Sequence, residues 1–166
     1  TAVTAVRRET WSCTDTPMPQ ARAAADVARV PAMVGAVEWL NRYEMRFVDG
    51  ILPMKEDSAE RDSQSLLWVR DNPPRPLDFA SLAAVSDVFF PRVWLRRAKR
   101  VPAGTVSITV YFHAGREELA AAGSGPLLAQ ARGQEFRNGF FDQSAQLWSE
   151  SGVMLATSHQ IVYYKE

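Results

Sequence analysis

The chain has 166 residues, of which 46% are hydrophobic and 23% are charged, a composition typical of one folded domain and not of a disordered or fibrous protein. Lys plus Arg and Asp plus Glu number 19 each, so no net charge attracts nucleic acid or an anionic membrane surface. The single cysteine, Cys13, excludes an internal disulfide and a multi-thiolate metal site. With no basic-then-apolar leader and no apolar run of about 18 to 20 residues, we expect a cytoplasmic protein.

The first half of the chain predicts strands joined by a proline-rich connector. Residues 1–12 are rich in Thr, Val and Trp, which favour a strand. Residues 15–31 contain three prolines around an Ala-rich piece and predict a connector with one helical turn. Apolar residues alternate with polar ones over 37–47, which indicates a strand with one solvent-exposed face. The short apolar run 66–69 predicts a second, buried strand.

The second half predicts one core helix followed by more strands. Asp78 is a suitable N-cap, and the residues that follow it are apolar nearly all round until Pro91, as in a helix buried on several sides. Alternation then predicts antiparallel strands at 105–113, 127–136, 140–148 and 153–164, with a hairpin turn at 149–152. This order indicates an α+β domain in which a long sheet wraps around a central helix.

Asp87 is the strongest single candidate for chemistry, because it is the only ionisable residue between Asp78 and Arg92. A carboxylate in an apolar helix either lies near the helix end in water or is hydrogen-bonded for a purpose. Thr105 and Gln160 lie in predicted strands. A Thr is common in strands because of its propensity, and a Gln in a strand usually faces solvent. Taken singly, each residue can be either structural or catalytic.

Two histidines, His113 and His159, could serve acid-base chemistry or bind a metal. Neither has a carboxylate or thiol at a recognised ligand spacing, so a structural role within the strands is favoured and no metal is expected. The sequence also has no phosphate-binding glycine loop and no Gly-x-Ser-x-Gly motif.

A basic cluster follows the predicted helix. It consists of Arg92, Arg96, Arg97, Lys99 and Arg100. A solvated face is the default interpretation of such a cluster, and contact with the phosphates of a nucleotide-bearing thioester is the alternative.

Three separated segments carry a resemblance to a known family. They are 85–91 (VSDVFFP), 104–113 (GTVSITVYFH) and 152–160 (GVMLATSHQ). In this order they resemble the C-terminal repeat of the double hot-dog acyl-CoA thioesterases, the thioesterase II-like enzymes. The resemblance implies a hot-dog fold, with Asp87, Thr105 and Gln160 holding the water that attacks the thioester of a fatty acyl-CoA. It implies no cofactor.

The resemblance also implies an organisation of the chain. Residues 1–13 match the closing strand of a missing N-terminal hot-dog repeat, 14–34 the linker and 35–166 the C-terminal hot-dog domain. We therefore expect a homo-oligomer, or pairing with the missing repeat. Two alternatives remain: a non-catalytic hot-dog module for acyl binding or assembly, and, less favoured, a hot-dog dehydratase using His113 or His159 with a carboxylate.

Overall fold

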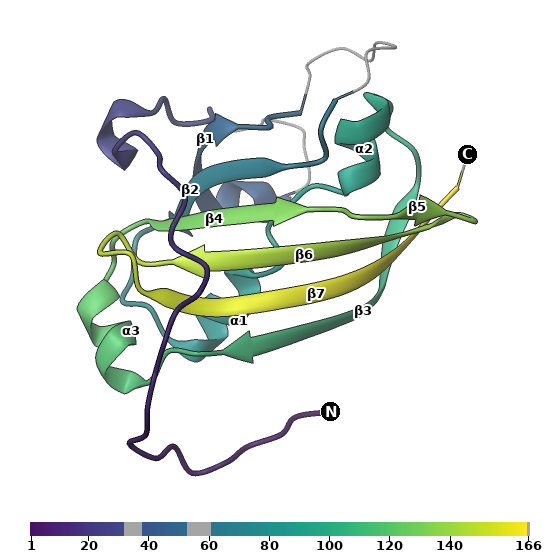
Figure 1. Ribbon diagram of the computed structural model, residues 1–166. Helices are drawn as coiled ribbons and strands as arrows, with labels where there is room; N and C mark the ends of the chain where they lie inside the picture. The colour runs from purple at the N-terminus through teal and green to yellow at the C-terminus, as the bar shows by residue number, and fades with distance from the viewer. Residues whose placement is uncertain (32–37, 53–60, 166) are drawn as a thin grey trace.

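The computed structural model describes residues 1–31, 38–52 and 61–165. Within them, seven strands form one antiparallel sheet in the order β1-β2-β4-β6-β7-β3, and the short β5 pairs with β6 (Figure 1). The strands are β1 (Tyr43–Asp49), β2 (Ser65–Asp71), β3 (Ala103–Phe112), β4 (Leu127–Arg132), β5 (Phe136–Arg137), β6 (Phe140–Trp148) and β7 (Met154–Tyr164). The α+β class with a long antiparallel sheet is confirmed.

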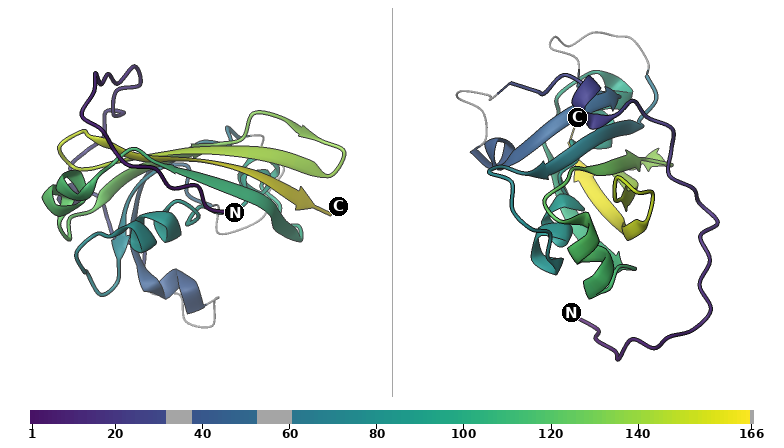
Figure 2. Two further views of the ribbon diagram at one scale, coloured as in Figure 1. Left: turned by 90° about the horizontal axis from the view of Figure 1, so that it is seen from below. Right: turned by 90° about the vertical axis from the view of Figure 1, so that its left-hand side faces the viewer.

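All the helices in the described residues are short. They are α1 (Phe79–Val85), α2 (Arg92–Arg97) and α3 (Arg116–Ala122), with two 3-10 helices, η1 (Ala24–Asp26) and η2 (Glu38–Arg42). Figure 2 shows α1 packed under the curved sheet, so that the sheet wraps around it. None of the described helices is long and apolar enough to cross a bilayer.

The residues at its two ends determine where helix α1 begins and ends. The Asp78 side chain accepts a 2.7 Å hydrogen bond from the Ser81 backbone amide and so caps the first turn. Leu82 and Val85 then face the core. The prediction of a helix reaching to Pro91 is wrong, because α1 ends at Val85. After Ser86 and Asp87 come Val88, Phe89 and Phe90, which are β-branched or aromatic, and Pro91 disfavours helical backbone in the residue before it.

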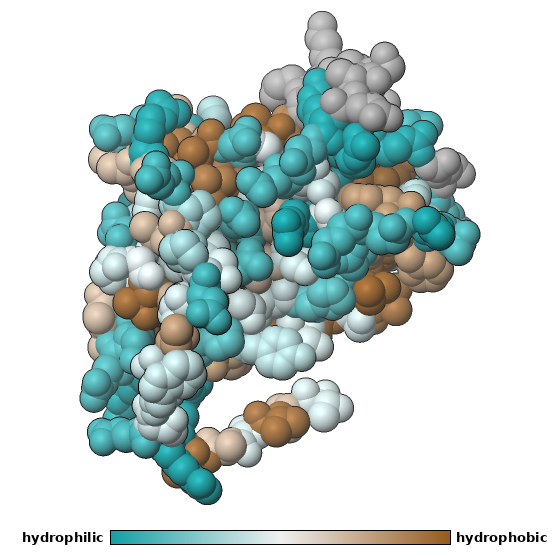
Figure 3. Space-filling model, viewed as in Figure 1, coloured by the Kyte–Doolittle hydropathy of each residue, from teal (hydrophilic) through white to brown (hydrophobic). Residues whose placement is uncertain are grey.

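One face of the sheet forms the core, as the alternation predicts. On β6 the inward positions are buried: Phe141, Gln143, Ala145 and Leu147. The positions between them are partly or fully exposed: Phe140, Asp142, Ser144 and Gln146. Figure 3 looks onto this outer face, where hydrophilic residues predominate. The main core therefore lies between the inner face of the sheet and α1.

Strand β3 is one edge of the sheet. Its neighbour among the described strands is β7, and the opposite edge of β3 has no strand beside it. Most of its residues are exposed, including Val106 at 61% and Tyr111 at 58%. An edge strand with exposed apolar side chains is a surface on which another strand can pair.

The strand predicted for residues 1–12 is absent: these residues are exposed and form no secondary structure. An extended segment becomes a strand only when its backbone groups pair with a neighbour, and here Arg7 alone reaches β3, donating to the carbonyls of Phe112 and His113. The connector has the expected single turn, η1, and packs onto the sheet. Its division from the domain at residue 34 stays a prediction.

Other differences concern short elements. The predicted strand 37–47 begins at Tyr43, after the 3-10 helix η2; Val37 lies outside the described residues. The strand predicted over 127–136 ends at Arg132, and β5 follows separately. Helices α2 and α3 were not predicted. The hairpin turn at 149–152 is confirmed, with the Gly152 amide donating to the Ser149 carbonyl.

We predict that Leu82→Ala destabilises the fold by about 2–5 kcal/mol, because the side chain is fully buried between α1 and the sheet. Ala80→Ser is the control on the same helix, since Ala80 is exposed, and should change the free energy of unfolding by less than about 0.5 kcal/mol. Urea unfolding followed by circular dichroism measures both. Equal effects of the two variants would contradict the placement of α1.

Candidate functional site

Asp87 lies in the turn that directly follows α1. Its backbone amide donates to the Ala84 carbonyl, so the last turn of the helix continues to this residue. The preceding residue, Ser86, is buried, and its carbonyl accepts a 3.1 Å hydrogen bond from Ser158 Oγ on β7. This bond ties the turn to the sheet and holds Asp87 opposite β7.

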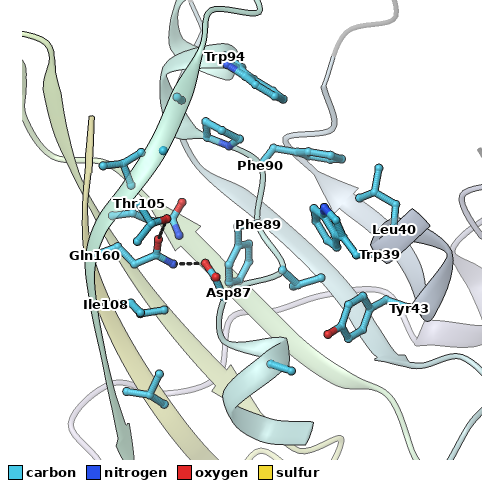
Figure 4. Close-up of a pocket in the computed structure, with 18 of the residues that line it drawn as sticks. Trp39, Leu40, Tyr43, Asp87, Phe89, Phe90, Trp94, Thr105, Ile108 and Gln160 are labelled. Carbon is cyan, nitrogen blue, oxygen red and sulfur yellow. Dashed lines mark hydrogen bonds between the residues drawn. The ribbon is translucent and has the colours of Figure 1, made fainter. Parts of the chain in front are cut away.

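Gln160 joins the two other predicted site residues. Its Nε2 donates to Asp87 Oδ1 at 2.7 Å, and its Oε1 accepts from Thr105 Oγ1 at 3.3 Å. Figure 4 shows the amide of Gln160 between the two side chains. The structure therefore brings together all three residues singled out in the sequence, from the α1 turn, from β3 and from β7.

An irregularity in β3 turns Thr105 towards this cluster. Thr105 pairs with Val162 and Ile108 with Gln160, with a register shift between Thr105 and Ser107. Val162 and Gln160 point to the same face of β7, because they are two residues apart. The extra residue in β3 thus lets Thr105 and Ile108, three residues apart, both face the cavity.

Gln160 and Asp87 differ in how far they are buried. Gln160 is 2% exposed, so the expectation that a strand Gln faces solvent does not hold, and both ends of its amide have partners. Asp87 is exposed as a residue, yet partial burial raises the pKa of its carboxyl above the ordinary value. The hydrogen bond from Gln160 lowers that pKa and offsets part of the rise.

A cavity of about 770 Å³ opens beside the cluster. Apart from the polar cluster, its lining is chiefly apolar and aromatic. The aromatic residues are Trp39, Tyr43, Phe89, Phe90 and Trp94. In Figure 4 the side chains of Trp39 and Tyr43 lie across the cavity from Asp87. Such a lining suits an apolar group bound next to a few oriented polar atoms.

The other sequence candidates lie elsewhere or have different roles. His113 Nε2 is 3.0 Å from Thr157 Oγ1, and His159 Nε2 is 3.9 Å from Asp142 Oδ2. Neither histidine lines the cavity. No group of three or more His, Cys, Asp or Glu side chains suited to a metal ion occurs within the residues that the structure describes.

The solvated interpretation of the basic cluster is wrong for Arg92, which is fully buried. Its guanidinium donates to carbonyl and side-chain oxygens of Phe90, Ser63, Ser65 and Gln143. Gln143 itself lines the cavity and was not singled out in the sequence. The available signal was its place on the inward face of β6, among apolar residues.

Comparison with known proteins agrees with the fold. The family model described as the acyl-CoA thioesterase C-terminal domain matches residues 12–164. A conserved protein of unknown function with a hot dog fold, from Alicyclobacillus acidocaldarius, is 42% identical; its structure matches with a TM-score of 0.87 over 96% of this chain and 59% of its own. No curated protein matches.

Two more distant structures share the fold. The tesB protein of Mycobacterium avium subspecies paratuberculosis is 18% identical, with a TM-score of 0.69 over 93% of this chain and 56% of its own. An acyl-CoA thioesterase II from Mycobacterium marinum is 17% identical, with a TM-score of 0.69 over 95% and 59%. The chain thus spans less than two thirds of the length of these structures. It has a hot-dog fold and belongs to the acyl-CoA thioesterase C-terminal domain family.

Proposed function

We propose that this chain is an acyl-CoA thioesterase that hydrolyses fatty acyl-CoA to a free fatty acid and CoA. The observation that carries the proposal is the hydrogen-bonded series Thr105, Gln160, Asp87 at the wall of an apolar cavity. Family membership supports a thioester substrate. The apolar lining supports a fatty acyl group as the part that enters the cavity.

The direction of the hydrogen bonds indicates how a water would be held. An ionised carboxylate only accepts, so the Gln160 nitrogen faces Asp87 and its oxygen faces Thr105. The Thr105 hydroxyl then donates its hydrogen to Gln160, and its oxygen lone pairs can accept a hydrogen bond in the cavity. A water can donate one hydrogen to Asp87 and the other to Thr105, which leaves an oxygen lone pair free to attack.

The reaction follows from that arrangement. Asp87 takes a proton from the water while the oxygen forms a bond to the thioester carbonyl carbon. The tetrahedral intermediate then expels the CoA sulfur, which receives the proton from Asp87. The products are the carboxylic acid and free CoA. A thiol is a good leaving group, so orientation and general-base help are sufficient catalytic elements.

The exposed edge of β3 supports a proposal about assembly. We infer that β3 pairs with a second hot-dog unit, from another copy of the chain or from an N-terminal repeat. Pairing would cover Val106 and Tyr111 and bring a further wall to the cavity beside Thr105. A non-catalytic module for acyl binding or assembly is the alternative function, and this same edge is the feature that favours it.

We predict that Asp87→Asn abolishes release of free thiol from fatty acyl-CoA, because the amide cannot take a proton from water. The loss in kcat should be at least about 100-fold, the scale of general-base catalysis. Asp142→Asn, a carboxylate on the outer face of the sheet, is the control. Binding of acyl-CoA with no Asp87-dependent turnover would instead favour the non-catalytic module.

The acidic limb of the pH profile should report the pKa of Asp87. Activity requires the ionised carboxylate, so kcat falls as the pH drops through a pKa that burial places above the ordinary Asp value. Gln160→Leu removes the hydrogen bond that lowers this pKa, so the limb should move to higher pH. Steady-state kinetics between about pH 4 and pH 8, a range that extends upward from the ordinary Asp pKa of about 3.9, measures the shift. A limb that stays in place would show that another group titrates.

Self-association through β3 should depend on the apolar character of that edge. Val106→Asp places a charge on it and should shift the protein towards monomer. Val153→Asp is the control, because Val153 is exposed in the β6–β7 hairpin, away from β3. Sedimentation equilibrium measures the dissociation constant. Equal association of both variants and the wild type would exclude β3 as the interface.

A further inference from the structure

Gln143 is a fourth polar side chain at the candidate site. It lies on β6 directly opposite Gln160 on β7, and both line the cavity. The two residues are 3% and 2% exposed. Directly opposed side chains on neighbouring antiparallel strands are about 5 Å apart at Cβ. Gln143 is therefore beside the Asp87–Gln160–Thr105 series without belonging to it.

Arg92 determines which way the Gln143 amide points. Its Nε donates to Gln143 Oε1 at 3.1 Å. A guanidinium has donors and no acceptors, so the oxygen of Gln143 must face it and Nε2 must point away. Nη1 of Arg92 donates to Ser63 O at 3.0 Å and to Ser65 Oγ at 2.8 Å. These bonds, with those to the Phe90 carbonyl, hold the guanidinium in one orientation.

The free end of the amide reaches the cavity. Among the described residues, the fully buried side-chain nitrogen or oxygen without a hydrogen-bond partner is the indole nitrogen of Trp148. Nε2 of Gln143 has no partner among those residues either. Because it is not fully buried like the Trp148 nitrogen, it retains some accessible surface. Gln143 lines the cavity and its oxygen is held by Arg92, so we infer that Nε2 is the end of the amide that faces the space where a substrate would lie.

A donor at this position fits the charge that the proposed reaction develops. When the water bonds to the thioester carbon, the carbonyl oxygen gains negative charge, and oriented donors in a water-poor site stabilise it. Asp87 and Thr105 offer acceptors for the water in the same cavity. Because Gln143, Asp87 and Thr105 line the same cavity, a thioester carbonyl bound there can contact the Gln143 amide while the water contacts Asp87 and Thr105.

The buried cation behind Gln143 strengthens that donor. Burial lowers the pKa of Arg92 to about 9, so the guanidinium keeps its charge at neutral pH. No carboxylate appears among its hydrogen-bond partners in the described residues. A positive charge at the oxygen end of an amide polarises the group and makes its N–H a better donor.

We propose that Gln143 is a catalytic residue that donates Nε2–H to the carbonyl oxygen of the thioester, and that Arg92 is the positioning residue that orients and polarises its amide. This inference rests on the proposed thioesterase function. It assigns the stabilisation of the oxyanion to a side chain of the sheet, on β6 next to Gln160.

Two substitutions of Gln143 test the donor while preserving the packing. Gln143→Met is similar in shape and has no N–H, and Gln143→Glu keeps an acceptor for Arg92 but also lacks the donor. Both should lower kcat by about 100- to 1,000-fold with little change in KM, the effect of removing one oxyanion donor. Gln146→Glu makes the same chemical change on the outer face of β6 and should leave kcat unchanged. Thermal unfolding of each variant checks that the fold is retained.

A spectroscopic measurement separates donation to the carbonyl from a structural role. The probe is a ketone analogue of a fatty acyl-CoA, in which a CH₂ group replaces the thioester sulfur and the carbonyl carries ¹³C. Isotope-edited infrared spectra should show a lower carbonyl stretching frequency on the wild-type protein and on Gln146→Glu than on Gln143→Met. A structural role alone would not produce this pattern.

The outcomes separate this inference from the function on which it rests. If the wild type neither binds the analogue nor releases thiol in an Asp87-dependent way, the thioesterase proposal fails and the role of Gln143 fails with it. If turnover depends on Asp87 but Gln143→Met keeps wild-type kcat and carbonyl frequency, the inference about Gln143 alone is overturned.

Discussion

The guanidinium of Arg92 joins three parts of the chain that are far apart in sequence. It binds the segment before β2 and the start of that strand through Ser63 and Ser65, the segment after α1 through Phe90, and β6 through Gln143. A buried cation is costly unless its donors are satisfied, so these segments must adopt their relative positions together. The cavity lies beside this junction, and two of the partners, Phe90 and Gln143, form part of its wall.

The remainder of the site depends on the way the sheet holds the turn after α1. Ser158 and Gln160 occupy alternate inward positions on β7; the first binds the Ser86 carbonyl and the second binds the Asp87 carboxylate. One strand therefore positions both the backbone and the side chain of the turn. The position of Asp87 therefore does not depend on a long helix, because β7 fixes the turn that follows the short helix α1.

Local patterns in the sequence were enough for the sheet and for the start of the core helix. Alternation gave β3, β6 and β7, and Asp78 marked the first turn of α1. The end of α1 and the existence of α3 were missed, because a short helix depends on packing more than on propensity. The strand expected over residues 1–12 was wrong because strand formation requires a partner, which a local pattern does not report.

The candidate site was harder to predict from residue chemistry. Gln160 has the features of a solvent-facing strand residue, and only the contact between β7 and the turn after α1 makes it a buried link. Asp87, Thr105 and Gln160 were grouped through family resemblance, and the structure brings them together. Arg92 looked like one of several surface charges, because its partners come from segments that the sequence gives no reason to join.

The position of Thr105 on an edge strand has a thermodynamic consequence. Any unit that pairs with β3 contacts the backbone that carries Thr105, so ligand occupancy and association share one structural element. By linkage, the factor by which a partner changes the affinity for a ligand equals the factor by which the ligand changes the affinity for the partner. Assembly and substrate binding would then be reciprocal measurements of a single coupling free energy.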